Sequence, residues 1–148
     1  MKKRKSVTYR GVRVAKTHVG RGVFATRTFP QDAIIGEITG ELIEDPDYES
    51  DYCLWLGDDW HLEPEAPFRF LNHHCEANCD FDCFEEEDDE GNIVEKVYVF
   101  ATRRISKGEE LSLDYGWPAD AAIPCQCGAD SCRGWIVCES ELPLLRAH

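Results

Sequence analysis

The most informative segment of the sequence is Arg69-Phe70-Leu71-Asn72-His73-His74-Cys75. It brings a cation, an amide, two imidazoles and a thiol together within seven residues. An amide carries two donors and an acceptor, and such a group beside imidazoles is uncommon in an apolar core. We therefore interpret the segment as a ligand-binding floor, a metal site or a polar crossing of two chain segments.

The size and composition of the chain are those of one globular domain. It has 148 residues, of which 43% are hydrophobic and 30% charged, enough for a substantial core. No apolar run approaches the roughly 20 residues that span a bilayer. The N-terminus, residues 1–6, is basic and is followed by Val7-Thr8-Tyr9-Arg10 rather than an apolar segment. It is interpreted as a solvated tail, not a signal peptide; a targeting or nucleic-acid-binding arm is the alternative.

The charge of the chain indicates the kind of partner. Twenty-nine acidic and sixteen basic residues give a net charge of −13. This excess argues against direct nucleic-acid binding, which usually requires a basic surface. It suits a basic protein or peptide, because complementary charge speeds encounter, although solubility alone explains it equally well. No membrane partner is expected, and the oligomeric state is not indicated.

Alternating and β-favouring residues predict many short strands and no long amphipathic helix. One strand is expected over 7–14, and another over 34–43 with Ile34, Gly36, Ile38, Gly40 and Leu42 on one face. Further strands are expected over 52–56, 60–63, 81–84, 93–101 and 111–116, and a short helix over 139–146. The acidic run Glu85–Glu90 is expected to lie in a hairpin loop, where it is solvated or receives a basic substrate.

The cysteines indicate a metal rather than disulfide bonds. Eight cysteines without a secretory signal are typical of a reducing, intracellular compartment. Cys125, Cys127 and Cys132 supply three thiolates within eight residues, whereas structural zinc requires four ligands. By residue type the fourth ligand is Cys75, Cys79, Cys83 or Cys138.

Four motifs in order resemble those of SET-domain lysine methyltransferases with a post-SET zinc segment. They are Val19-Gly20-Arg21-Gly22-Val23-Phe24, the segment Arg69 to Cys79, Gly108 to Tyr115 and Cys125 to Trp135. Together they extend from about Tyr9 to Val137. The resemblance implies residues 7–117 as the SET domain and 118–148 as the post-SET segment and C-terminal tail. It also implies a mostly β fold of several small sheets, with a pseudoknot and a C-terminal zinc knuckle.

The resemblance further implies a site for S-adenosylmethionine and zinc. Tyr115 would be the catalytic tyrosine, and Tyr52 would line the methyl-transfer site. The cofactor-binding residues would be Val19, Arg21, Tyr52, Asn72, His73, Gln126 and Trp135. The zinc ligands would be Cys75, Cys125, Cys127 and Cys132.

The implied reaction is methyl transfer to a neutral lysine amine of a basic, histone-like substrate. Lysine is ordinarily charged below a pKa of about 10.4, and a dry aromatic channel favours the neutral form. Two departures from the family are His74, in place of a serine, and Leu113, in place of an aromatic residue. The alternatives are a catalytically silent SET-like module that binds a basic partner, and a zinc-stabilised scaffold without a small ligand. The expected location is the cytoplasm in a bacterium or the nucleus in a eukaryote.

Overall fold

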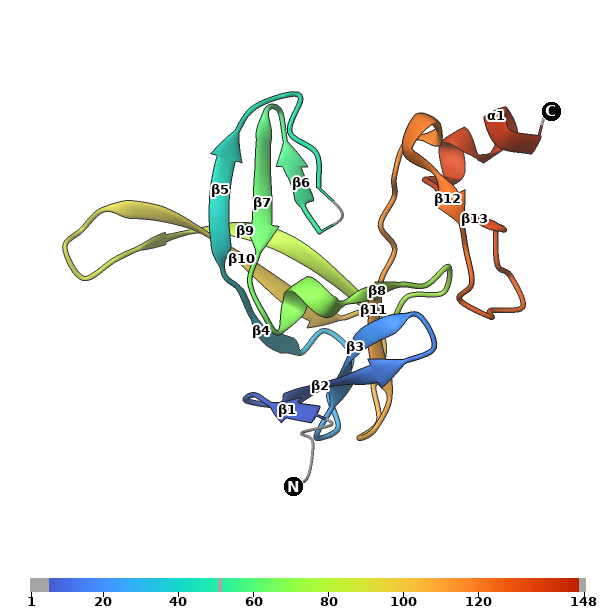
Figure 1. The fold of residues 1–148 in the computed structure, drawn as a ribbon. Helices are drawn as coiled ribbons and strands as arrows, with labels where there is room; N and C mark the ends of the chain where they lie inside the picture. The colour runs from blue at the N-terminus through green and yellow to red at the C-terminus, as the bar shows by residue number, and fades with distance from the viewer. Residues whose placement is uncertain (1–5, 51, 147–148) are drawn as a thin grey trace, which may run out of the picture.

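The computed structural model describes residues 6–50 and 52–146, which form short strands and very little helix (Figure 1). The strands are β1 (Ser6–Thr8), β2 (Val12–Thr17), β3 (Gly20–Ala25), β4 (Ile34–Ile38), β5 (Gly40–Glu44), β6 (Leu54–Gly57), β7 (Trp60–Pro64), β8 (Asn72–His73), β9 (Cys79–Glu87), β10 (Ile93–Ala101), β11 (Glu110–Leu113), β12 (Ile123–Pro124) and β13 (Trp135–Ile136). The helical segments are the 3-10 turns Phe68–Phe70, Ala119–Ala121 and Glu139–Glu141, and helix α1 (Leu142–Arg146). The expected mostly β class is confirmed.

The strands form several small sheets. The largest has the order β1-β2-β3-β11-β8, and two three-stranded sheets have the orders β4-β10-β9 and β5-β7-β6. Strands β12 and β13 form a two-stranded ribbon in the C-terminal region, set apart from the other sheets (Figure 1). No helix in the described part of the chain is long and apolar enough to cross a membrane.

The central feature is the parallel pairing of β8 with β11. Ser112 pairs with Asn72, and Leu113 with His73. A parallel pair needs a long connection between its strands, and here the β9–β10 hairpin lies between them in sequence. This pairing places the Asn72–His73 segment directly beside the strand that leads to Tyr115.

Two expected strands are each divided in the structure, so these predictions were wrong in part. The expected strand 7–14 is two antiparallel strands, β1 and β2, with a turn at Gly11, whose φ of 80° requires a left-handed backbone. The expected strand 34–43 breaks at Thr39, and its halves join different sheets. A register shift between Val99 and Phe100 of β10 accompanies the pairing with β4. Ile34 is consequently 55% exposed while Ile35 is buried, contrary to the predicted alternation.

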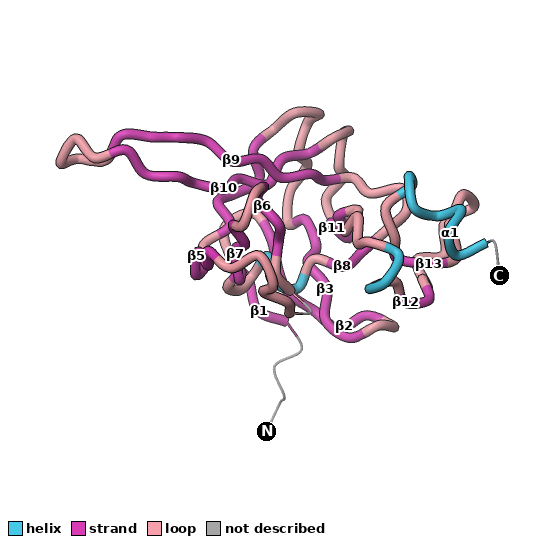
Figure 2. Tube along the Cα trace, turned by 90° about the horizontal axis from the view of Figure 1, so that it is seen from above, coloured by secondary structure: helices cyan, strands magenta, loops and turns pink. Residues whose placement is uncertain are grey.

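The hairpins follow the sequence more closely. The predicted pair 52–56 and 60–63 forms the β6–β7 hairpin, but β6 begins at Leu54 and leaves Tyr52 outside the strand. Strand β9 continues through Glu87, so only the end of the acidic run belongs to the turn that precedes β10. The resulting β9–β10 hairpin projects from the body of the molecule (Figure 2).

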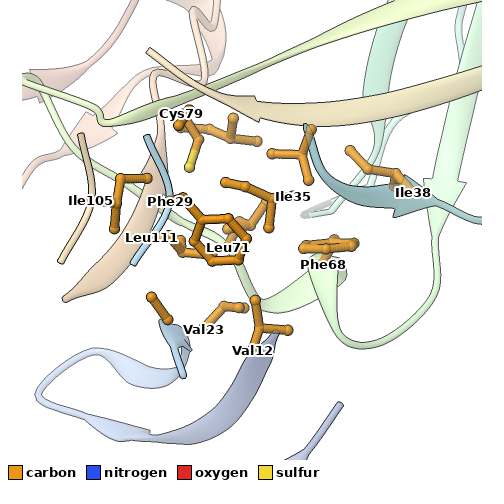
Figure 3. Close-up of a cluster of buried hydrophobic side chains, with 14 of the residues drawn as sticks. Val12, Val23, Phe29, Ile35, Ile38, Phe68, Leu71, Cys79, Ile105 and Leu111 are labelled. Carbon is orange, nitrogen blue, oxygen red and sulfur yellow. The ribbon is translucent and has the colours of Figure 1, made fainter. Parts of the chain in front are cut away.

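A single apolar cluster lies where the sheets meet. Its completely buried members include Phe29, Ile105, Leu111, Val12 and Val23, which come from segments far apart in sequence (Figure 3). Leu111 and Leu113 of β11 belong to this cluster, while Tyr115 packs against its edge. The core therefore anchors β11, which ends at Leu113, two residues before the predicted catalytic Tyr115, and does not reach residue 116 as expected.

Candidate active site and metal centre

Tyr115 is held at both its backbone and its hydroxyl group. Its hydroxyl donates to the carbonyl of Leu71, and its backbone N–H donates to Nδ1 of His73 over 3.1 Å. The ring also lies against Trp117, with centroids 5.2 Å apart. Burial raises the pKa of Tyr115 to about 12. The phenol therefore keeps its proton at neutral pH and serves as an oriented hydroxyl rather than a base.

His73 is a buried, neutral imidazole. Burial lowers its pKa to about 4, so the 3.7 Å approach of Nδ1 to the carboxylate of Asp114 is not an ion pair at neutral pH. Because Nδ1 accepts from Tyr115, the ring proton belongs on Nε2. That nitrogen lies 3.5 Å from Sγ of Cys75. The ring thus links the tyrosine to the cysteine cluster.

Asn72 ties three strands together. Its amide donates to the carbonyl of Arg21 and to Oε2 of Glu110, both over 2.9 Å. Gly22 makes this arrangement possible, because an added Cβ would lie 2.6 Å from Oε2 of Glu110 and 2.7 Å from Thr17. Both amide hydrogens of Asn72 therefore serve the protein itself, and its carbonyl oxygen is left for a ligand.

Asn78 is a structural residue of the site that the sequence analysis did not single out. It is buried, and its Oδ1 accepts from the backbone N–H of Ser112 while its Nδ2 donates to the carbonyl of Glu110, each over 2.9 Å. These bonds fasten β11 along its length. The sequence signal was its place within the Arg69–Cys79 motif.

The four cysteines implied as zinc ligands converge in space. The Sγ atoms of Cys75, Cys125, Cys127 and Cys132 all lie within 4.8 Å of one another. The Cys75 and Cys125 sulfurs are 3.8 Å apart, which matches the spacing of about 3.8 Å expected between thiolates around tetrahedral zinc with Zn–S bonds of about 2.3 Å. The donor set and spacing therefore fit a closed structural zinc site.

The other candidates for the fourth ligand lie elsewhere. Cys79 is buried in the apolar core, where burial raises the pKa of its thiol to about 12. Cys83 lies on β9, and Cys138 approaches Ser140 instead. Of the four candidates, Cys75 is the one that the structure brings together with Cys125, Cys127 and Cys132.

Arg133 is a second residue that the sequence analysis did not single out. Its backbone N–H approaches Sγ of Cys75 at 3.4 Å, and its guanidinium lies 2.9 Å from the Asp114 carboxylate. The second contact is an ion pair without hydrogen-bond alignment, since Nη2 has no hydrogen-bond partner among the described residues. Its only sequence signal was its position directly after the predicted zinc ligand Cys132.

Two adjoining cavities open around these residues. The first, of about 360 Å³, is lined by His18, Val19, Asn72, His73, His74, Glu110, Ser112, Tyr115, Trp117, Ile123, Pro124, Cys125, Gln126, Cys127 and Ile136. The second, of about 340 Å³, is lined by Val19, Gly20, Arg21, Tyr52, Arg69, Phe70, Leu71, Asn72 and Tyr115. Val19, Asn72 and Tyr115 line both cavities. The two cavities therefore adjoin each other at these three residues, and together they are called the cleft.

The predicted residues divide between the ends of this cleft. Gln126 lines the first cavity, and its backbone carbonyl lies 3.1 Å from Nε2 of His18, a residue for which the sequence predicted no role. Arg21 and Tyr52 line the second cavity. Trp135 lines neither; it belongs to β13, opposite Pro124 of β12, and its closing over a cofactor stays a prediction.

His74, which replaces a serine of the family motif, also lines the first cavity. Its Nδ1 accepts from the backbone N–H of Glu76 over 2.9 Å, and its own backbone N–H donates to the carbonyl of Leu113. The ring therefore supports the turn between β8 and the predicted zinc ligand Cys75, in addition to forming part of the cavity wall.

Comparisons with known proteins agree with this fold and site. The SET domain family model matches residues 20–116. The chain is 34% identical to histone-lysine N-methyltransferase trithorax of Drosophila virilis, 31% to histone-lysine N-methyltransferase trr of Drosophila melanogaster and 30% to histone-lysine N-methyltransferase ASHR3 of Arabidopsis thaliana. The alignments cover 84%, 91% and 89% of this chain, but only 4%, 6% and 29% of those relatives.

Solved structures show the same architecture. A crystal structure of KRYPTONITE in complex with mCHG DNA and SAH matches with a TM-score of 0.70 and 25% identity, over 83% of this chain and 28% of that one. A KRYPTONITE complex with mCHH DNA, H3(1-15) peptide and SAH also has a TM-score of 0.70, at 24% identity, over 83% of this chain and 29% of that one. The chain belongs to the SET-domain family, as its four motifs indicate.

Proposed function

We propose that this chain transfers a methyl group from S-adenosylmethionine to a lysine side chain of a basic, histone-like protein. The observation that carries the proposal is the position of Tyr115. Tyr115 is partly buried, keeps its proton at neutral pH and lines both cavities of the cleft. A donor and acceptor of fixed orientation at such a junction suits group transfer from the middle of an elongated cofactor that extends into both cavities.

The cleft has the residue types that an elongated, partly apolar and partly charged cofactor requires. Ile123, Pro124 and Ile136 give the first cavity an apolar wall suited to an adenine ring. Arg21 gives the second cavity a cation suited to the carboxylate of a methionine moiety. S-adenosylmethionine, when bound, supplies an electrophilic methyl group. The 25%-identical KRYPTONITE structure, which holds SAH, supports this assignment.

The chain's own residues would position the lysine and exclude water. Tyr115 already donates its proton to the carbonyl of Leu71, so its oxygen keeps lone pairs that can accept an amine N–H. The nearby rings of Tyr52 and Trp117 would disfavour water, and a dry site lowers the pKa of a lysine amine from its usual value of about 10.4. No side-chain base is then needed, and positioning would contribute up to roughly 7–11 kcal/mol.

The cysteine cluster would hold a structural zinc ion. Four thiolates leave no open coordination position, so the metal would stabilise the fold rather than take part in the chemistry. It would fasten the segment that carries Gln126 to Cys75, which follows the floor of the cleft. This role supports the proposed division of the chain into a SET domain, 7–117, and a post-SET segment and C-terminal tail, 118–148.

The substrate class rests on the relatives and on charge. The relatives named above are histone-lysine N-methyltransferases, and histone tails are basic. The net charge of −13 would favour encounter with such a partner. The intracellular location stays a prediction.

The decisive experiment combines cofactor binding with transfer. Isothermal calorimetry with S-adenosylhomocysteine should give saturable, one-to-one binding. Labelled S-adenosylmethionine should then transfer its methyl group to a member of a panel of basic proteins that includes histones, and mass spectrometry should place the label on lysine. Binding without transfer to any panel member would favour the silent module, and no binding would overturn the proposal.

A further inference from the structure

The loop before β6, residues 45–50 and 52–53, is tied to strand β7 through the carboxylate of Glu63. We propose that Glu63 is a positioning residue, which acts through Ser50 to hold Tyr52 in the cleft. This inference rests on the proposed function, because Tyr52 lines the cavity assigned to the methionine end of the cofactor. It assigns a role to a carboxylate that itself lines neither cavity.

The hydrogen bonds form a continuous chain from Glu63 to Tyr52. The hydroxyl of Ser50 donates to Oε1 of Glu63 over 2.6 Å, and the hydroxyl of Tyr48 donates to the same oxygen over 2.8 Å. The backbone N–H groups of Tyr52 and Cys53 in turn donate to Oγ of Ser50, over 3.1 and 2.9 Å. The Ser50 bond has the short length typical of a hydroxyl that donates to a carboxylate.

The valence of the Ser50 hydroxyl makes Glu63 necessary. A hydroxyl group offers one donor and two acceptor lone pairs. The two lone pairs of Ser50 receive the N–H groups of Tyr52 and Cys53, and its one proton goes to Glu63. Without the carboxylate the Ser50 hydroxyl would lose its acceptor. Its oxygen would then no longer be oriented toward the N–H groups of Tyr52 and Cys53.

Tyr52 needs this support because strand pairing does not reach it. Strand β6 begins at Leu54, and the side chain of Tyr52 is 42% exposed. Glu63, by contrast, lies in β7, the central strand of the β5-β7-β6 sheet, where it pairs with Glu41 of β5. The hydrogen bonds from Glu63 through Ser50 thus connect the loop residue Tyr52 to a residue held in a sheet.

One face of the Tyr52 ring packs against the side chain of Arg69. The guanidinium carbon of Arg69 lies 4.4 Å from its ring centroid, a distance typical of a cation–π contact. Such a contact leaves the ring free to slide across the guanidinium. The backbone bonds to Ser50 therefore set the position of Tyr52 along the cleft, and Arg69 supports its face.

The test is a double-mutant cycle between Glu63 and Tyr52. Glu63→Ala should weaken S-adenosylhomocysteine binding or slow single-turnover transfer by about 10-fold, the equivalent of about 1.4 kcal/mol. The same change in a Tyr52→Ala background should have almost no further effect, because both act through one side chain. Glu63→Gln, which keeps an acceptor oxygen, should retain most of the function. Glu44→Ala, on β5 of the same sheet, is the control and should behave as wild type.

Amide hydrogen exchange makes the test independent of the proposed function. Glu63→Ala should accelerate exchange at the N–H groups of Tyr52 and Cys53 without ligand, while Glu44→Ala should not. Unchanged exchange at both amides would overturn the inference, and so would additive effects of Glu63→Ala and Tyr52→Ala on binding and rate. A wild-type protein that neither binds S-adenosylhomocysteine nor transfers a methyl group would overturn the proposed function. The contribution of Glu63 to cofactor binding and transfer would fall with it, even if exchange responds as expected.

Discussion

The guanidinium of Arg133 lies 2.9 Å from the carboxylate of Asp114. Arg133 follows the zinc-ligand candidate Cys132, and Asp114 precedes Tyr115. The side chain of Arg133 is only 12% exposed, whereas that of Asp114 is 42% exposed. The pair therefore joins the cysteine cluster to the end of β11 through a cation that has lost most of its water.

Replacement of either member of this pair should loosen the site without removing the metal. Because Asp114 is partly exposed, we expect Asp114→Asn to cost only about 1–2 kcal/mol of folding free energy. Methyl transfer should fall about 10-fold or more as Tyr115 loses its fixed position. Chemical denaturation and steady-state kinetics measure the two effects. Loss of zinc from the variant would contradict a link that lies outside the metal site.

Removal of Cys75 should release the metal. Cys75→Ser should lose one equivalent of zinc, because three remaining thiolates cannot close a tetrahedral site. The C-terminal segment of the variant should then become sensitive to protease. Wild-type protein treated with a strong chelator should show the same sensitivity. Elemental analysis and limited proteolysis test this expectation. Cys53→Ser, outside the cluster, is the matched control and should keep its metal; an equal zinc content in both variants would refute the assignment.

Removal of the Tyr115 hydroxyl should separate binding from transfer. Tyr115→Phe keeps the ring that packs against Trp117 but loses the bond to Leu71. We expect transfer to fall by about 100-fold or more, with the S-adenosylhomocysteine dissociation constant within about 3-fold of wild type. Calorimetry and single-turnover kinetics give the two numbers. Wild-type turnover by the variant would exclude Tyr115 from the reaction.

The raised pKa values of Tyr115 and Tyr98 should make the stability of the fold depend on pH in the alkaline range. Burial raises the pKa of Tyr115 to about 12, and a hydrogen bond to Glu86 raises the pKa of Tyr98 to about 12. In the unfolded chain both titrate near the usual value of about 10. The unfolded state therefore loses protons first, so stability that is fully present below about pH 10 is lost as the pH rises to about 12.

Chemical denaturation across this alkaline range measures the loss. Tyr115→Phe and Tyr98→Phe should each make the free energy of unfolding less dependent on pH, because each removes one group whose pKa is raised in the folded state. An unaltered pH dependence in both variants would show that neither phenol is responsible.

Replacement of Asn78 should lower the stability of the fold, because this buried side chain bonds to two backbone groups of β11. Asn78→Ala removes an acceptor for Ser112 and a donor to Glu110 in a buried setting, so we expect a loss of about 2–4 kcal/mol. Urea denaturation measures it. Asn92→Ala, at the exposed tip of the β9–β10 hairpin, should cost less than about 0.5 kcal/mol. Similar losses at the two positions would argue against the clamp on β11.

Local patterns in the sequence were sufficient for the class of fold, the β6–β7 and β9–β10 hairpins, three of the four clustered cysteines and the identity of the family. These features depend on residues within a few positions of one another, such as the spacing of Cys125, Cys127 and Cys132. Short-range spacing determines which side chains can meet on one turn or one strand. The resemblance of the four motifs also led to Cys75 and Tyr115. It led to six further residues that line the cleft, Val19, Arg21, Tyr52, Asn72, His73 and Gln126, but it included Trp135, which lines neither cavity.

Contacts between distant segments decided the rest. The approach of Cys75 to Cys125 spans 50 residues, and the bonds from Asn78 to β11 span 32 and 34. The break at Thr39 and the exposure of Ile34 depend on pairing with β7 and β10, which a period-2 pattern does not contain. Arg133, Asn78 and Glu63 gain their roles only from partners that the fold brings to them. The sequence therefore determined which groups the site contains, while packing and long-range pairing determined which of them meet.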